Sequence, residues 1–196
     1  MDCNHKNFSK EDAELDFLGM KFNHNTLVCN DCGAYLRGKD FESAYMEWLN
    51  ERYHQKRDKF QVQCHLSKNL TMCLDKFIED YPGVTQAALM RALVTVYINH
   101  IDINTDLVSR FNSLMNKDIL SSFNSDDDRK KVNIQFKPKM MVQLISISEL
   151  VLQRPSQICE TSIIKMMACF TSQDENLKTF WNQEIQGYID TILKAA

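Results

Sequence analysis

The 196-residue chain has few of the residues that make tight turns, with only five Gly and three Pro. A sandwich or barrel of many short strands needs more of them, because each hairpin requires its own turn. The hydrophobic fraction of 44% and the charged fraction of 25% are nevertheless those of an ordinary globular protein. We therefore expect one or two domains that are mainly α-helical.

The sequence also lacks long apolar runs and a large excess of charge of one sign. No stretch approaches the roughly 20 apolar residues that a membrane span needs, and the start MDCNHKNF has no apolar signal core. The seven Cys are an odd number, and several lie in apolar helical patterns, which argues against a disulfide framework. We expect a cytoplasmic protein without a membrane partner. Because the net charge is −3, any affinity for nucleic acid must come from local basic clusters.

No pattern typical of an active site is present. The chain has no Gly-rich phosphate loop, no nucleophile elbow and no acid pair in a recognisable motif. The sequence therefore predicts a protein that is not an enzyme.

Cysteine and histidine instead cluster near the N-terminus. The pair Cys3 and His5 precedes the pair Cys29 and Cys32, and Gly33 follows directly, as the sharp turn of a metal knuckle requires. Zn²⁺ prefers four such ligands in a tetrahedron, and four protein ligands leave no position for a catalytic water. We expect a structural zinc site on these four residues, with His24 as the alternative to His5. The competing interpretation is a set of reduced surface cysteines beside a flexible start.

Two later segments share one pattern. In residues 60–66 and again in residues 132–137, apolar residues alternate with polar ones, as in a half-buried strand. Each segment is followed by two helix-period runs, and the second helix of the first copy has Thr85 as its expected N-cap. The copies match at a shift of 74 residues in the helices and of 72 in the strands. This repetition predicts an internal duplication.

A strand followed by two helices cannot bury its apolar face alone, so we expect the two strands to pair antiparallel above four helices. The expected organisation is a zinc-binding module at 1–39, a connecting helix at 40–59, and repeat units at 60–104 and 129–171. A helical linker with an acidic hinge at 105–128 separates the units. An amphipathic helix at 172–196 either docks or forms a homo-oligomer.

The first repeat resembles a ribbon-helix-helix DNA-binding domain of the Arc and MetJ type. The resemblance rests on the alternating strand FQVQCHL, the turn with Gly83 and the second helix that opens at Thr85. Two such units in one chain look like the single-chain versions found among conjugation accessory proteins of the TraY kind. The resemblance implies a tandem ribbon-helix-helix fold and double-stranded DNA as the partner. A transcriptional regulator and a relaxosome factor that meets a relaxase at a plasmid transfer origin are both consistent with it.

The resemblance also implies which residues contact DNA. The outward strand positions would read bases in the major groove, and the start of the second helix would contact phosphate at Thr85. In the second copy that helix start would fall at Cys159 and Glu160, where a carboxylate is unfavourable. The expected base-reading residues are Gln61, Gln63, His65, Asn133, Gln135 and Lys137.

The residue chemistry is compatible with this expectation. Gln and Asn can pair bidentately with adenine and Lys reaches the acceptors of guanine, while basic residues beside the strands suit phosphates. The expected flanking contacts are Lys59, Lys68, Lys131 and Lys139. An adaptor that is stabilised by zinc and binds only proteins is the alternative function.

Overall fold

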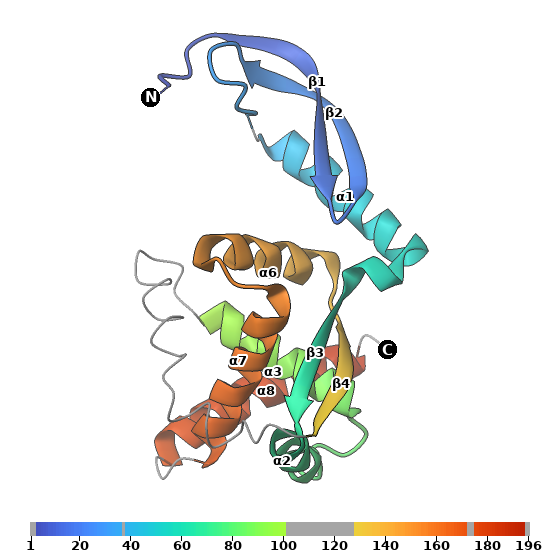
Figure 1. The fold of residues 1–196 in the computed structure, drawn as a ribbon, viewed down its shortest axis with the longest axis vertical. Helices are drawn as coiled ribbons and strands as arrows, with labels where there is room; N and C mark the ends of the chain where they lie inside the picture. The colour runs from blue at the N-terminus through green and yellow to red at the C-terminus, as the bar shows by residue number, and fades with distance from the viewer. Residues whose placement is uncertain (1–2, 37, 101–127, 172–174, 195–196) are drawn as a thin grey trace. The chain divides into compact units, whose positions relative to one another are not determined.

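The computed structural model describes residues 3–36, 38–100, 128–171 and 175–194. The chain divides into two compact units, Met1–Lys59 and Phe60–Ala196 (Figure 1). Apart from Asp128, the expected linker at 105–128 lies outside the described residues.

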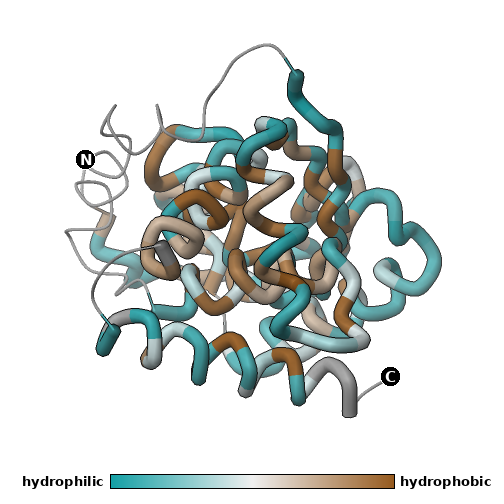
Figure 2. The backbone as a smooth tube through the Cα atoms, turned by 90° about the horizontal axis from the view of Figure 1, so that it is seen from below, coloured by the Kyte–Doolittle hydropathy of each residue, from teal (hydrophilic) through white to brown (hydrophobic). Residues whose placement is uncertain are grey.

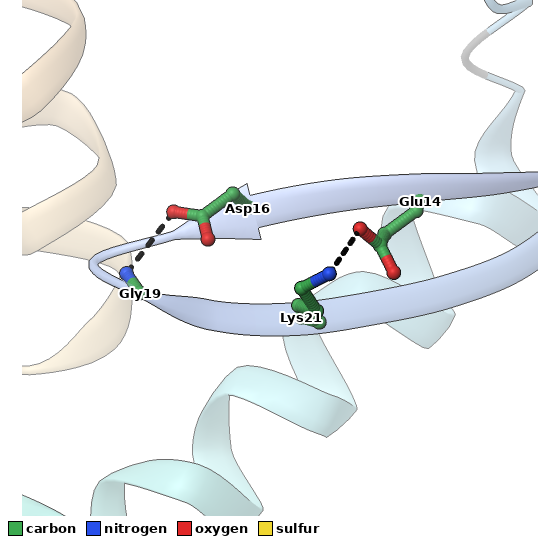
Figure 3. Close-up of polar contacts among 4 residues, drawn as sticks. All are labelled: Glu14, Asp16, Gly19 and Lys21. Atoms are coloured by element: carbon green, nitrogen blue, oxygen red, sulfur yellow. Dashed lines mark hydrogen bonds and ion pairs between the residues drawn. The ribbon is translucent and has the colours of Figure 1, made fainter.

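The first unit begins with an antiparallel hairpin that the sequence analysis did not predict. Strand β1 (Phe8–Phe17) pairs with β2 (Met20–Cys29) along its full length. Leu18 and Gly19 form the two-residue turn with φ of 55° and 74°, and two positive φ angles are typical of a type I′ hairpin turn. The Asp16 carboxylate accepts a hydrogen bond of 3.0 Å from the Gly19 N–H, and Lys21 pairs with Glu14 at 2.8 Å (Figure 3). These contacts hold the tip of the hairpin.

Helix α1 (Lys39–Gln55) covers one face of this hairpin through aromatic packing. The ring of Phe22 on β2 lies 5.8 Å from Phe41, 5.3 Å from Tyr45 and 5.3 Å from Trp48, measured between ring centroids. The hairpin thus gains the second layer that two strands need in order to be stable in water. A short 3₁₀ helix, η1 (Arg57–Phe60), follows.

The second unit contains the two strands that the alternation predicted. Strand β3 (Gln61–Ser67) pairs antiparallel with β4 (Arg129–Gln135), with Gln61 opposite Gln135 and Ser67 opposite Arg129 (Figure 1). The prediction of antiparallel pairing is therefore confirmed. The second strand was placed wrongly, since it spans 129–135 rather than 132–137.

In the described residues of the second unit, five helices accompany this ribbon. Helices α2 (Lys68–Ile78) and α3 (Gln86–His100) follow β3, while α6 (Pro138–Val151) and α7 (Pro155–Thr171) follow β4. Each strand packs against the second helix of the other repeat, because α7 contacts β3 and α3 contacts β4. Hydrophobic residues gather in the middle of the bundle (Figure 2). Its fully buried large side chains include Phe60, Leu66, Leu70, Leu74, Leu89, Leu93, Ile98, Ile134 and Phe136.

Helix α8 (Glu175–Lys194) packs against α3 and α7, with Ile185 and Ile189 buried. Docking, one of the two expected outcomes, is therefore observed for this helix. The described residues are thus mainly helical, with two small antiparallel sheets of two strands each.

The helix starts correct the offset between the repeats. The first helices begin at Lys68 and Pro138, 70 residues apart, and the second helices begin at Gln86 and Pro155, 69 apart. The expected helix shift of 74 was wrong, because α6 has 14 residues where α2 has 11 and apolar residues recur every three to four positions along both. A shift by one helical turn therefore preserves most apolar matches.

Candidate metal centre and polar ribbon face

The four predicted metal ligands lie together at the end of the hairpin opposite its turn. The ligand atoms of Cys3, His5, Cys29 and Cys32 all lie within 4.8 Å of one another. The two Sγ atoms of Cys3 and Cys29 are 3.5 Å apart, as are the Cys32 Sγ and the His5 Nδ1. The expected clustering is confirmed for all four residues.

The backbone explains how residues so far apart in sequence meet. The Asn30 N–H donates to the Asn7 carbonyl at 2.9 Å, which joins the N-terminal segment to the end of β2. Gly33, at φ 72°, donates its N–H to the Cys29 carbonyl at 2.8 Å and closes the turn that carries Cys32. Any residue other than Gly would have a strained backbone at this positive φ.

The spacing is compatible with a metal ion bound in a tetrahedron. With Zn–S of about 2.3 Å and Zn–N of about 2.0–2.1 Å, a tetrahedron places its ligand atoms about 3.6–3.8 Å apart. The Cys3–Cys29 and His5–Cys32 separations, both 3.5 Å, are close to this edge length. Three thiolates and one imidazole form a closed donor set, so the cluster can hold a metal ion structurally and leaves no ligand position for substrate.

The cluster also shifts the pKa values of two thiols in opposite directions. A hydrogen bond from the Asp31 backbone N–H lowers the pKa of Cys29 to about 6. The backbone N–H of His5 acts in the same direction on Cys3. The hydrogen bond with Cys29, the loss of solvation and the hydrogen bond with Cys32 together outweigh it and raise the pKa of Cys3 to about 11. Close thiols cannot all ionise without a cation among them, whereas a bound divalent ion would replace their protons.

His24 is not a member of the cluster. It lies in the middle of β2, opposite Ala13, and its ring stacks on Phe22 with 5.7 Å between centroids. Its other neighbour, Phe41, lies 5.3 Å away. His24 is therefore part of the aromatic packing under α1, and His5 supplies the ring nitrogen of the cluster.

The ribbon of the second unit presents a second candidate site. The inner positions Val62, Cys64 and Ile134 are buried, so the alternate positions point away from the helices. Gln61 faces Gln135, Gln63 faces Asn133, and His65 faces Lys131. We call these six residues the polar ribbon face; all are exposed except Gln135, which is half-buried.

Five of the six predicted base-reading residues belong to this face, and Lys137 does not. Lys137 lies beyond the end of β4 and is the N-cap residue of α6. Lys131, expected only as a flanking residue, takes the sixth position opposite His65. The sequence signal was missing because residues 129–131 are all basic and show no alternation, so only their pairing with β3 reveals that they form a strand.

Of the two expected starts of a second helix, the structure confirms the one at Thr85 only. The Thr85 side chain accepts a hydrogen bond of 3.2 Å from the Ala88 N–H, which confirms it as the cap of α3. The expectation for Cys159 and Glu160 was wrong, because α7 begins four residues earlier than Cys159, at Pro155. Arg154 corresponds to Thr85, and its carbonyl accepts the N–H of Ile158 as the Thr85 carbonyl accepts that of Leu89.

Glu160 instead faces the open edge of the ribbon. One of its carboxylate oxygens accepts a hydrogen bond of 2.9 Å from the backbone N–H of His65. Cys159 is fully buried, and burial raises its pKa well above the ordinary value for a thiol. A buried neutral thiol is a core residue rather than a nucleophile.

The remaining predicted flanking lysines are exposed. Lys68 begins α2 and Lys139 lies in the first turn of α6. Lys59 lies in η1 and belongs to the first unit. Arg129 and Lys130, at the start of β4, are also exposed.

Comparisons of the chain with models of known protein families, with curated proteins and with solved structures found no match.

None of the helices in the described part of the chain combines the length and the hydropathy that crossing a bilayer requires.

Proposed function

We propose that this chain is a sequence-specific double-stranded DNA-binding protein that reads the major groove with the β3–β4 ribbon. The observation that carries the proposal is the polar ribbon face itself: six polar side chains in three cross-strand pairs, on the side of the ribbon away from the helices. In this proposal the second unit is a tandem ribbon-helix-helix domain within one chain.

The dimensions and chemistry of the face suit a duplex. A major groove about 12 Å wide admits a two-stranded ribbon. The amides of Gln61, Gln63, Asn133 and Gln135 can each donate to and accept from an adenine, and Lys131 can donate to the acceptors of guanine.

Basic residues around the ribbon would contact phosphates. Lys68, Arg129, Lys130, Lys137 and Lys139 all lie on or beside the ribbon and are exposed. Each phosphate contact releases counterions, so the affinity would fall steeply as salt rises. Thr85, which caps α3, would place the N-terminal amides of that helix against a phosphate of the DNA backbone.

The biological role that fits is regulation of transcription at an operator or assistance to a relaxase at a plasmid transfer origin. Both roles need the same act, the recognition of one duplex sequence. The first unit would hold a structural Zn²⁺ on Cys3, His5, Cys29 and Cys32, supported by the tetrahedral spacing of these ligands.

A specific observation favours a second candidate function for the first unit, that of a protein adaptor. Three large apolar side chains are exposed in the segments that carry the ligands: Phe8 at 37%, Tyr35 at 38% and Leu36 at 48%. Phe8 is the strand partner of Cys29, and Tyr35 and Leu36 follow Cys32 closely. Exposed apolar groups held by a rigid site are suited to contacts with a protein.

Selection of bound duplexes from a random pool, at several salt concentrations, tests the DNA proposal. We expect one enriched motif, and the double variant Gln63→Ala with Gln135→Ala should lose binding to it. The control Gln183→Ala with Gln186→Ala removes two exposed amides from α8 and should leave binding unchanged. No enrichment even at low salt would refute DNA recognition, and the adaptor function would then be pursued by screening for protein partners.

A further inference from the structure

The two halves of the polar ribbon face are not equivalent. The 70-residue offset of the first helices relates Gln63 to Asn133, and these two residues also face each other in the ribbon. The same offset would exchange Gln61 with Lys131 and His65 with Gln135, so each exchange replaces an amide by a residue of different chemistry.

This exchange gives the ribbon two different ends. Gln61 and Gln135 form one cross-strand pair, in which both side chains are amides that donate and accept. His65 and Lys131 form the pair at the other end, where Lys131 only donates and His65 can donate through a ring N–H. The amide end and the donor end therefore suit different base pairs.

We propose that a single chain recognises an asymmetric duplex site, with an A·T pair under the amide end and a G·C pair under the donor end. This inference rests on the proposed function. Adenine presents one donor and one acceptor in the major groove, which an amide satisfies bidentately. Guanine presents two acceptors, O6 and N7, which two donors satisfy and which an amide oxygen would oppose.

The length of the ribbon sets the spacing of the two base pairs. Gln61 and His65 are four residues apart on one strand, which is about 13 Å at roughly 3.3 Å per residue. Base pairs are stacked about 3.4 Å apart, so the two ends lie about four base pairs from each other.

The central pair, Gln63 and Asn133, adds a third contact, and both of its side chains are amides. The Gln63 Nε2 donates to the Asn133 Oδ1 at 3.4 Å. This bond does not use the side-chain carbonyl of Gln63 or the side-chain N–H groups of Asn133. The pair as a whole can therefore still accept hydrogen bonds from a base and donate to it. An A·T pair near the middle of the site satisfies both groups.

Further groups beside the donor end keep its net charge positive. One carboxylate oxygen of Glu160 accepts the backbone N–H of His65, and Asp128 precedes β4. Against these two acids stand Lys68, Arg129, Lys130 and Lys131. The amide end has no charged residue in its cross-strand pair, so base contacts there depend on hydrogen bonding rather than on charge.

The duplex selection can be scored for symmetry as well as for enrichment. Using the full zinc-loaded chain, we expect a motif without inverted symmetry, with A·T and G·C preferences about four base pairs apart. Replacing that G·C pair by A·T should weaken binding about tenfold. An inverted repeat would overturn the asymmetric site while the proposed function stands, and absence of any motif would overturn both.

A variant that makes both ends alike tests the residue assignment. His65→Gln with Lys131→Gln should move the preference at the donor end from G·C to A·T, with a change of about tenfold in the ratio of the two affinities. Lys76→Gln removes one exposed charge from the last turn of α2 and should leave the motif unchanged. If the double variant weakens all duplexes uniformly and keeps the same motif, the two residues contact phosphate only and the inference is wrong.

Discussion

The side-chain amide of Gln63 donates a hydrogen bond of 3.4 Å to the side-chain carbonyl of Asn133, although 70 residues separate them in the sequence. The bond joins the central of the three cross-strand pairs of the polar ribbon face. Both side chains are exposed, so water can replace this bond at little cost in stability. The pair is therefore better placed to bind a ligand than to hold the fold.

We predict that Gln63→Ala with Asn133→Ala changes the free energy of unfolding by no more than about 0.5 kcal/mol, as is usual for exposed sites. The same variant should lose specific duplex binding. Urea denaturation and a duplex titration measure the two effects on one protein preparation. A loss of more than about 2 kcal/mol would show that the pair is structural and would remove the support that its exposure gives to a binding role.

The ribbon and the metal cluster could be predicted because their signals are local. Alternation in residues 60–66 specified one strand, and the types and spacing of the four ligands specified the cluster. The limits of β4 could not be predicted in the same way. The start of β4 is a strand because β3 supplies backbone partners for it. The last three pairs of the ribbon join His65 to Lys131, Leu66 to Lys130 and Ser67 to Arg129.

The β1–β2 hairpin was missed for a related reason. Its turn, Leu18–Gly19, lacks the Asn or Asp that marks such turns in a sequence, and four acidic residues interrupt the apolar pattern of β1. The stabilising partners lie elsewhere, on α1, where Phe41, Tyr45 and Trp48 pack around Phe22. The hairpin is stabilised by packing between segments that are distant in the sequence, and the hydrophobic periodicity within one segment does not reveal such packing.

Removal of the metal should affect one unit only. We predict that a chelator, or Cys29→Ser, unfolds the β1–β2 hairpin together with its packing on α1 and leaves the second unit folded, because the four ligands all belong to the first unit. The two Trp residues report the units separately: Trp48 packs on Phe22, and Trp181 packs beside His100. Fluorescence of a Trp181→Phe variant should change on chelation, and that of Trp48→Phe should not.

The matched control is His24→Gln, which alters a histidine outside the cluster and should retain one zinc per chain by atomic absorption. Equal zinc content in Cys29→Ser and in the unaltered protein would contradict the assignment of Cys29 as a ligand.

The cap of α3 offers a test that separates folding from binding. Thr85→Ala should lower the free energy of unfolding of the second unit by about 1 kcal/mol, because the Ala88 N–H loses its acceptor. Thr85→Ser keeps the hydroxyl and should restore stability. If DNA contacts the helix N-terminus, Thr85→Ala should also weaken all duplexes to a similar degree, while Thr85→Ser behaves as the unaltered protein in both measurements.

Packing between the two repeats predicts a large effect at Leu93. This residue of α3 is fully buried in the helical bundle, so Leu93→Ala should cost about 2–5 kcal/mol through lost burial and the cavity left behind. Met72→Ala, at a position that is 53% exposed, should cost much less. Denaturant midpoints at equal m-values provide the comparison, and similar costs for the two variants would contradict the placement of α3 in the core.

Tyr81 predicts how stability falls in alkali. Burial raises the pKa of its phenol to about 12, above an ordinary value of 10, and its hydroxyl lies 3.3 Å from Asn182 Oδ1. Between pH 10 and pH 12 the phenol therefore stays protonated in the folded state but ionises in the unfolded chain. The contribution is complete below pH 10 and is lost as pH rises through 12. Tyr81→Phe cannot ionise, so its free energy of unfolding should decline less over this range. Parallel curves for the two proteins, measured by urea denaturation between pH 9 and pH 12, would show that the phenol ionises equally in both states.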